Sequence, residues 1–331
     1  MILLLLWVVS SLSCLNPQNK SIISETKVDK LIVLTTVSPI TSIVENIGGN
    51  RIFLQGIVPE GVNSHTFEPT MSIGQLISKA DLIILNGLFL EESVLQMAKA
   101  NKKKNGIILS LGDETISQED WIFDFSFPKE SEKPNPHLWT DPILALKYAE
   151  IVKDQLIVLD NDNAEYFMNN YDKLKNRIEL LDELIKLATA SINPSNRKLL
   201  TYHDSFPFFA KRYGFEIIGA IQPSDFSEPS SKEIAELIDQ IKKEKVPVIF
   251  GATMFPSPVM RQIAIESGAK YVDKLRDDSL PGKISEYTHT YLGLMIVNLT
   301  IIINELGGDA QFFNDFEVGN VFEEASTAVY P

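Results

Sequence analysis

DNDNAEYFMNNYDKLKNRIELLDELIKLATASI, residues 160–192, is the stretch that decides the fold of this 331-residue chain. It contains neither Gly nor Pro, and it opens with Asp160-Asn161-Asp162, residue types that are favoured at a helix N-terminus. Its apolar residues recur in steps of four and three, the spacing of one helix face: Phe167, Tyr171, Leu174, Ile178, Leu181 and Ile185. Such a helix spans about 45 Å, enough to cross a domain. We therefore predict a backbone helix over residues 160–193 that joins two lobes; the alternative, a coiled coil, needs a longer repeat.

The sequence before this helix alternates between strand and helix patterns. Leu31–Val37 is a continuous apolar and β-branched run, which indicates a buried parallel strand. A helix follows from Ser38-Pro39 to Gly48-Gly49, with Pro near its start and Gly at its end. The same criteria predict strands at Arg51–Val58, Asp81–Leu85 and Ile107–Leu111, and helices at Met71–Ala80 and Glu91–Lys102. This alternation predicts an α/β lobe with a parallel sheet over residues 30–159.

The sequence after the long helix repeats the scheme and predicts a second α/β lobe over residues 194–308. Strands are expected at Lys198–Tyr202, Phe215–Ala220, Pro247–Gly251 and Lys270–Asp273. Helices are expected at Ser205–Tyr213, Ser231–Glu244, Pro258–Ser267 and Ile284–Leu306. Residues 309–331 form an acidic, aromatic tail, which we expect to pack on the second lobe.

Composition excludes one class of partner. The chain is 44% hydrophobic, which suits a globular protein with room for two cores. Its formal net charge is -14. A nucleic-acid-binding surface needs Lys and Arg to neutralise phosphates, so this charge argues against nucleic acid as a partner.

The first residues have the features of an export signal. Ile2–Val9 is an unbroken apolar run, too short to span a bilayer but suited to the core of a signal peptide. A basic segment before it is missing, so the true start of the signal stays open. Cys14, the only cysteine, resembles a lipoprotein attachment site, with an incidental Cys in a discarded peptide as the alternative. We expect residues 1–14 to be a signal peptide or lipoprotein signal that directs the protein to the periplasm or the outer face of the cytoplasmic membrane.

Three of the four histidines lie in predicted loops. His65 and His203 follow predicted strands, and His137 ends a Pro-rich loop. Ligands of α/β sheets bind beyond the carboxyl ends of the strands, which is where such loops lie. A closed metal site needs a fourth ligand, and the best acidic candidate in the second lobe is the Asp277-Asp278 pair. Spacing alone is weak evidence, because the chain has no close histidine pair.

Four stretches together resemble the metal-binding solute-binding proteins of zinc and manganese ABC importers: His65–Pro69, Asn135–Asp141, Tyr202–Ser205 and Asp278–Leu280. Their order and spacing, and the long connecting helix, match this family from Leu31 to Gly308. The resemblance implies a metal site in the cleft between the lobes, with His65 and His137 from the first lobe and His203 and Asp278 from the second. It also implies one transported divalent metal, no enzymatic activity, and as partners an ABC permease with its ATPase subunit.

The identity of the metal stays open between zinc and manganese. Zinc-specific members of this family often carry a His-rich loop before the second ligand, whereas Asp113–Pro136 contains no histidine and is acidic and aromatic. His203 points the other way, because imidazole suits zinc and carboxylate suits manganese. We favour zinc by a small margin.

Other residues and functions remain as alternatives. His289 matches no ligand of the family, so we expect it to be packed or to cap the last helix. Glu68, Asp141 and Asp204 lie near ligands and could accept hydrogen bonds from imidazole rings or cap helices. The competing functions are a binding protein for a metal chelate or other small solute, a zinc hydrolase, for which no H-E-x-x-H motif is present, and cell adhesion. We expect a monomer.

Overall fold

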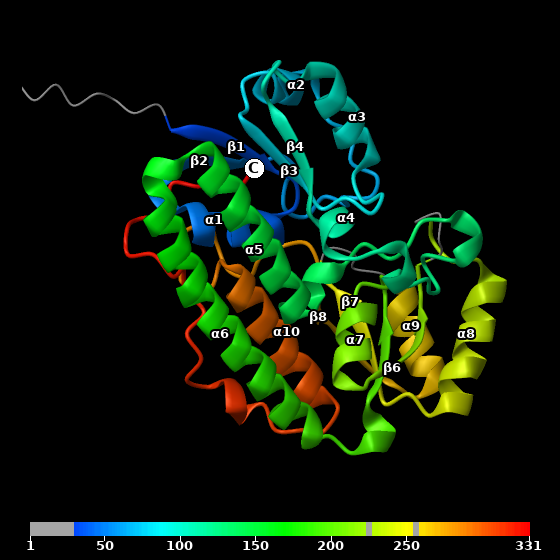
Figure 1. Ribbon diagram of the computed structural model, residues 1–331. Coiled ribbons are helices and arrows are strands. Elements are labelled where there is room, and N and C mark those ends of the chain that lie inside the picture. Colours follow the sequence, from blue (N-terminus) through cyan, green and yellow to red (C-terminus); the bar gives the residue numbers. More distant parts are fainter. Residues whose placement is uncertain (1–29, 223–226, 254–257) are drawn as a thin grey trace, which may run out of the picture.

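The computed structural model describes residues 30–222, 227–253 and 258–331, which form two α/β lobes beside a pair of long helices (Figure 1). The predicted signal of residues 1–14, with Cys14, lies outside the described residues. Within them, no helix combines the length and the apolar character that crossing a membrane requires.

The first lobe contains a four-stranded sheet in the order β2-β1-β3-β4, with all neighbours parallel. Its strands are β1 (Leu31–Thr35), β2 (Ile52–Gly56), β3 (Leu82–Leu85) and β4 (Ile107–Ser110). Its helices are α1 (Ser38–Gly48), α2 (Met71–Ile77), α3 (Glu92–Asn101) and α4 (Leu111–Thr115). Because the strands are parallel, the loops that follow β2 and β4 leave from the same edge of the sheet.

The second lobe repeats this arrangement with the order β6-β5-β7-β8, again parallel. Its strands are β5 (Lys198–Thr201), β6 (Glu216–Ala220), β7 (Val248–Ala252) and β8 (Lys270–Leu275). Its helices are α7 (Pro207–Tyr213), α8 (Ser231–Glu244), α9 (Pro258–Ser267) and α10 (Tyr291–Glu305).

The last helix begins seven residues later than predicted. Ser285 has a φ of 73°, a left-handed conformation that a helix does not accommodate. The side chain of Thr290 then caps α10 by accepting a hydrogen bond from the backbone nitrogen of Gly293. The residues after β8 therefore form a long loop, which carries Asp277 and Asp278.

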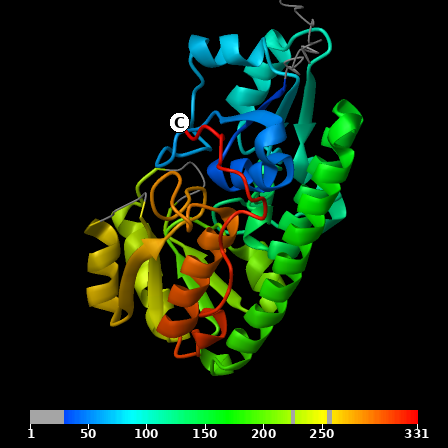
Figure 2. The same cartoon turned by 90° about the vertical axis from the view of Figure 1, so that its left-hand side faces the viewer.

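The predicted backbone helix is present as α6 (Ala164–Ala190), preceded by a short 3-10 turn at Asn161–Asn163. It is somewhat shorter than the predicted 160–193, and it runs along both lobes (Figures 1 and 2). A second long helix, α5 (Pro142–Leu159), was not predicted; it packs against α6 and returns the chain in the opposite direction. The backbone of the molecule is therefore a helix pair.

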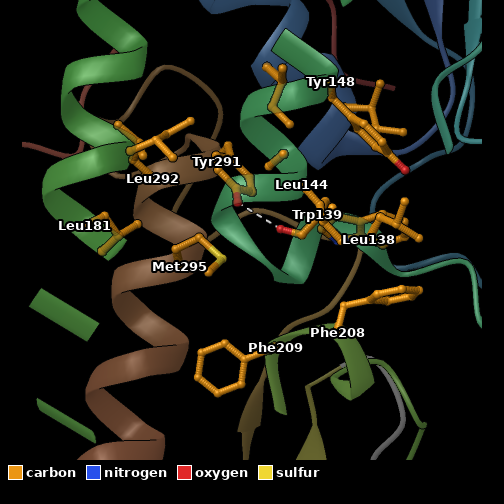
Figure 3. Packing of buried hydrophobic residues seen from close by; sticks show 14 of the residues in the cluster. Leu138, Trp139, Leu144, Tyr148, Leu181, Phe208, Phe209, Tyr291, Leu292 and Met295 are labelled. Carbon is orange, nitrogen blue, oxygen red and sulfur yellow. Dashed lines mark hydrogen bonds between the residues drawn. The ribbon is translucent and has the colours of Figure 1, made fainter. Parts of the chain in front are cut away.

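The two lobes share one hydrophobic core (Figure 3). The buried cluster contains Trp139, just before α5, and Tyr148, in α5. It also contains Phe209 of α7 and Met295 of α10. The hydroxyl of Tyr291 donates to the carbonyl of Trp139 at 2.8 Å within this cluster. Smaller clusters lie apart from it in each lobe. A shared core resists separation of the lobes, because opening it would expose apolar surface to water.

The C-terminal tail, residues 309–331, runs from the second lobe to the first (Figure 2). It does not stay on the second lobe, as the sequence suggested. Val329 pairs with β2: its nitrogen donates to Leu54 O at 3.0 Å, and its carbonyl accepts from Gly56 N at 2.8 Å. Side chains along the tail are buried, namely Phe313, Val318, Val321, Phe322 and Tyr330.

Candidate metal centre

His65 lies in the loop between β2 and α2, beyond the carboxyl end of β2. Its backbone nitrogen donates to Asn63 Oδ1 at 2.9 Å, which fixes the loop locally. The residue is half-buried, whereas the other two candidate histidines are buried. His65 is therefore the most accessible of the three.

His137 lies just before α5 and is held from behind by Asn135. Asn135 Oδ1 accepts from the backbone nitrogen of His137 at 3.0 Å and lies 2.8 Å from His137 Nδ1. A carbonyl oxygen can only accept, so Nδ1 carries the ring proton and the Nε2 lone pair points away from Asn135. The amide nitrogen of Asn135 donates to the carbonyl of Asp204 at 2.5 Å, which ties this support to the second lobe.

His203 lies two residues after the end of β5 and has an equivalent support. Its Nδ1 lies 3.0 Å from Gln222 Oε1, just beyond β6. An amide oxygen at this position again assigns the proton to Nδ1 and leaves Nε2 as the donor atom. Sequence analysis did not identify Gln222 or Asn135 in this role. Gln222 is 19 residues from His203, so no local sequence pattern indicates their contact. Asn135 lies inside one of the four stretches that carry the family resemblance.

The three histidines converge although they come from separate loops. Their Nε2 atoms are 3.4 Å apart for His65 and His137, 3.2 Å for His65 and His203, and 3.1 Å for His137 and His203. Zinc–imidazole bonds are about 2.0–2.1 Å long, so two nitrogens of a tetrahedral site lie roughly 3.3–3.4 Å apart. The spacing of these nitrogens matches that of ligands around one metal ion.

Electrostatics keeps the histidines neutral. Burial lowers the pKa of His65 and His137 well below the usual value, and repulsion from neighbouring histidines lowers it further. Burial also lowers the pKa of His203, although Asp277 and Gln222 oppose this shift. Neutral imidazole is the form that binds metals.

Asp278 lies beside this group but is not part of it. Among the described residues, the ligand atoms that all lie within 4.8 Å of one another belong to His65, His137 and His203 alone. Asp278 Oδ2 accepts from Ser64 Oγ at 2.9 Å, next to His65 in sequence. Its other oxygen is buried without a hydrogen-bond partner. Burial and then repulsion from Asp277 raise the pKa of Asp278, so this carboxyl group lacks a compensating positive charge.

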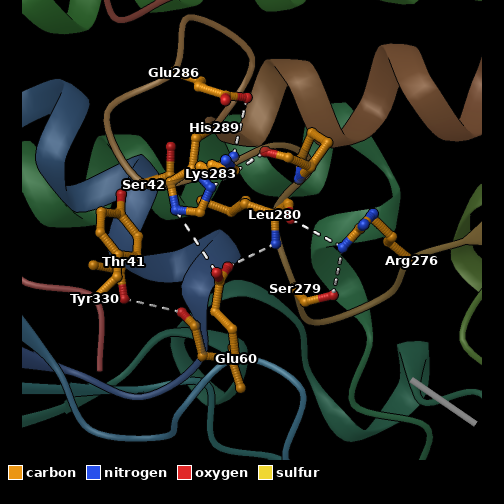
Figure 4. A network of polar contacts seen from close by, with 12 residues as sticks. Thr41, Ser42, Glu60, Arg276, Ser279, Leu280, Lys283, Glu286, His289 and Tyr330 are labelled. Atoms are coloured by element: carbon orange, nitrogen blue, oxygen red, sulfur yellow. Dashed lines mark hydrogen bonds and ion pairs between the residues drawn. The ribbon is translucent and has the colours of Figure 1, made fainter. Parts of the chain in front are cut away.

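The loop that carries Asp278 is tied to the first lobe (Figure 4). Glu60, in the same loop as His65, accepts from the backbone nitrogen of Leu280 at 2.8 Å. Trp139 Nε1 donates to the carbonyl of Asp277 at 2.8 Å. His289 lies outside the histidine group, is buried, and its Nδ1 donates to Pro281 O at 3.2 Å. It therefore supports the Asp278 loop, and it precedes α10 without capping it.

The three acidic residues near the ligands have separate structural contacts. Asp141 caps α5 through Ile143 N and pairs with Arg212 of the second lobe at 2.6 Å. Glu68 accepts from Ser93 Oγ at 2.8 Å. Asp204 faces Asp124, and burial followed by repulsion from Asp124 raises the pKa of Asp204.

Residues 121–136, called here the covering loop, extend from the first lobe over the histidines. Ser126 Oγ donates to the carbonyl of Gln222 at 3.1 Å, which links this loop to the second lobe. The ring of Phe127 lies 5.5 Å from that of His65, 5.8 Å from that of His137 and 5.9 Å from that of His203, measured between centroids. An aromatic side chain thus lies against all three imidazole rings.

Known proteins share this fold and sequence. The manganese-binding lipoprotein MntA of Halalkalibacterium halodurans is 26% identical over 276 residues, 83% of this chain and 88% of that protein. The iron-binding protein YfeA of Yersinia pestis is 27% identical over 272 residues, 82% and 84% of the two chains. The solved structure of the periplasmic zinc-binding protein TroA of Treponema pallidum superimposes with a TM-score of 0.76 at 26% identity, covering 84% of this chain and 99% of that one.

The sequence also matches a whole family over residues 33–305, which include both lobes and the three histidines. That family is described as zinc-uptake complex component A, periplasmic. The match takes in most of the 331 residues and leaves only the two ends of the chain outside it. The chain therefore belongs to the family of zinc-uptake complex component A, the substrate-binding components of metal ABC transporters.

Proposed function

We propose that this protein captures one divalent transition metal ion through His65, His137, His203 and Asp278 and delivers it to an ABC permease with its ATPase subunit. It acts as a monomer on the outer side of the cytoplasmic membrane. Residues 1–14 are its export signal, and Cys14 is the candidate lipid attachment site. The reaction involves no chemical step: protein ligands replace water around the ion and later return it.

The observation that carries the proposal is the convergence of three imidazole nitrogens at 3.1–3.4 Å. Because Nδ1 carries the proton in His137 and His203, the Nε2 atoms of these two rings are both acceptors and repel each other at 3.1 Å. A cation at the centre of the three nitrogens would replace this repulsion with a bond to each of them. Support also comes from Asn135 and Gln222, which orient the rings of His137 and His203 as carboxylates and amides do around known metal sites.

Asp278 completes the site by moving a short distance or by coordinating with its unpartnered oxygen. A carboxylate would neutralise one charge of a divalent ion, which three neutral imidazoles cannot do. The buried oxygen that lacks a partner supports this role. Asp277 is the alternative, but its carboxylate Oδ1 already accepts from the backbone nitrogen of Asp278 at 3.1 Å.

Zinc is the favoured metal over manganese, because three imidazoles with one carboxylate form a ligand set that suits zinc. Relatives named for manganese and iron show that this family divides among metals. Affinity alone is a biased criterion, since most nitrogen sites bind zinc more tightly than manganese.

The test is metal analysis and competitive titration with zinc and manganese on the mature, tag-free protein. We expect one zinc per chain. Loss of an orienting group around a metal costs about 10–100-fold in affinity, so His203→Ala should cost at least the upper end of that range. Asp278→Asn should weaken binding and keep the stoichiometry. The matched control is His289→Asn, which removes the fourth histidine and retains a donor for Pro281 O.

Each outcome decides one part of the proposal. Wild-type protein that holds no stoichiometric metal overturns it. Equal affinity in the wild type and His203→Ala removes the histidine site. A preference for manganese beyond that expected from ligand chemistry reassigns the metal and leaves the site in place.

A further inference from the structure

A cavity of about 190 Å³ lies beside His65. Its walls come from the covering loop and from the turn between β3 and α3, and include Leu88, Phe89, Ser126, Phe127 and Pro136. Of the three histidines, only His65 lines it. His137 and His203 are 1% and 5% exposed, so an ion that approaches from solvent through this cavity meets His65 first.

Phe127 lines this cavity and also packs against the histidine cluster. Its side chain is 7% exposed, and its ring lies within 6 Å of all three imidazole rings. It therefore covers His65, His137 and His203 together. An apolar ring in this place excludes the water that a bound ion needs when it exchanges protein ligands for hydration.

The backbone of Phe127 is hydrogen-bonded within its own turn. Phe127 O accepts from Asp124 N at 2.9 Å, and Phe127 N donates to Asp124 Oδ1 at 3.2 Å, both within one short turn. Towards the second lobe, the Ser126 hydroxyl donates to Gln222 O at 3.1 Å, and Asp124 and Phe125 lie against Asp204. The cavity on one side of the Phe127 ring gives the ring space to turn aside without opening the shared core between the lobes.

We propose that the cavity beside His65 is the route by which the metal enters and leaves, and that Phe127 is its gate. The inference rests on the proposed function, since it needs a metal at the three histidines. It assigns metal exchange to a side-chain rotation in the covering loop. Separation of the lobes is not required, which agrees with the core that they share.

The experiment is stopped-flow release of zinc from the loaded protein into excess EDTA, with capture rates measured on the metal-free protein. Opening the gate accelerates both directions, so Phe127→Ala should release zinc at least about tenfold faster, while the dissociation constant changes less than the rate. Phe127→Leu keeps an apolar cover and should lie between Phe127→Ala and the wild type. The matched control is Phe125→Ala, two residues away and 52% exposed, which should release zinc like the wild type.

The results separate the gate from the site. If the wild type binds zinc but Phe127→Ala releases it at the wild-type rate, the gate is wrong and the site stands. If release accelerates only as much as affinity falls, with capture unchanged, Phe127 stabilises the bound state and is not a gate. If the wild type binds no zinc, the proposed function itself fails. Phe127→Leu keeps the test open if the alanine variant does not fold.

Discussion

Two segments cross from one lobe to the other, the covering loop and the C-terminal tail, and they are held in different ways. The covering loop reaches the second lobe through polar contacts, Ser126 on Gln222 and Asn135 on Asp204. The tail pairs its backbone with β2 and buries a series of apolar side chains. Burial of apolar surface stabilises more strongly than a few exchangeable hydrogen bonds. The tail therefore joins the lobes mainly through backbone pairing and apolar burial, while the covering loop joins them through polar contacts around the metal site.

Two buried carboxylates anchor different parts of the molecule, one the tail and the other the wall of the cavity. Glu45, in α1, receives the hydroxyls of Ser326 and Tyr330, so it anchors the tail. Glu91 accepts from Thr36 and from the backbone of Asn86 and Gly87, so it anchors the turn that forms the wall of the cavity. That turn contains positive φ at Gly87, Leu88 and Phe89. Leu88 and Phe89 are non-glycine residues in the left-handed region, and backbone strain of this kind clusters at functional sites.

The largest effect that we predict falls on the tail. Phe322 is 7% exposed, and truncation of a buried Phe to Ala costs about 3–5 kcal/mol, so Phe322→Ala should lower the free energy of unfolding by that amount. Phe312, 40% exposed in the same tail, is the matched control, and Phe312→Ala should cost little. Urea unfolding of the metal-free protein measures both. Zinc release should stay at the wild-type rate; acceleration equal to that of Phe127→Ala would mean that the tail also gates the site.

A pH-dependent effect should come from the wall of the cavity. Burial raises the pKa of Glu91 from 4.5 to about 7, against the opposing hydrogen bonds from Thr36, Asn86 and Gly87. Since the folded state holds this proton more tightly than the unfolded chain, the stabilisation is complete below the unfolded pKa and is lost as pH rises through the folded one. A shift of this size corresponds to about 3 kcal/mol. Other groups titrate in the same window, so a difference between variants is needed.

Glu91→Gln provides that difference, because Gln stays neutral at every pH. Urea unfolding of wild type and Glu91→Gln near the two ends of the window should show that the wild type loses more stability with rising pH. Glu45→Gln, at the anchor of the tail, is the comparison variant. Parallel pH profiles for wild type and Glu91→Gln would show that Glu91 is not protonated in the folded protein.

Much of the architecture could be predicted because it depends on local patterns. The β-branched runs of β1 and β3 and the apolar face of α6 are each visible within a few residues of sequence. Helix α5 was not predicted, because its sequence is apolar on most sides and so has no clear amphipathic stripe. The helix packs against both α1 and α6. The start of α10 was misplaced because a left-handed residue at Ser285 has no signature comparable to Gly.

The site was predictable in its histidines and not in its surroundings. His65, His137 and His203 were found because they stand in loops after strands and match a family pattern. The contacts of Gln222 and Phe127 depend on how distant loops meet, which periodicity does not describe. The continuation of the tail to the first lobe could not be predicted for the same reason: its apolar residues indicate burial but not the partner that buries them.

The smallest predicted effect is on the rate of zinc capture. It concerns the mouth of the cavity, at the outer end of the route that Phe127 gates. Lys133 pairs with Glu92 there, with both side chains about half exposed. A positive charge within about 10 Å of an approaching divalent ion repels it, so Lys133→Met should raise the rate of zinc capture about 2–5-fold at low ionic strength. The effect should vanish at high salt and be smaller on release, because the gate, and not the charge at the mouth, limits the exit of the ion. Lys104→Met, at the opposite edge of the sheet before β4, is the control and should leave capture unchanged. Equal capture rates for the wild type and Lys133→Met at low salt would place the route elsewhere. Phe127→Ala tests the gate at the inner end of the same cavity. The two variants together therefore determine whether the ion passes along it.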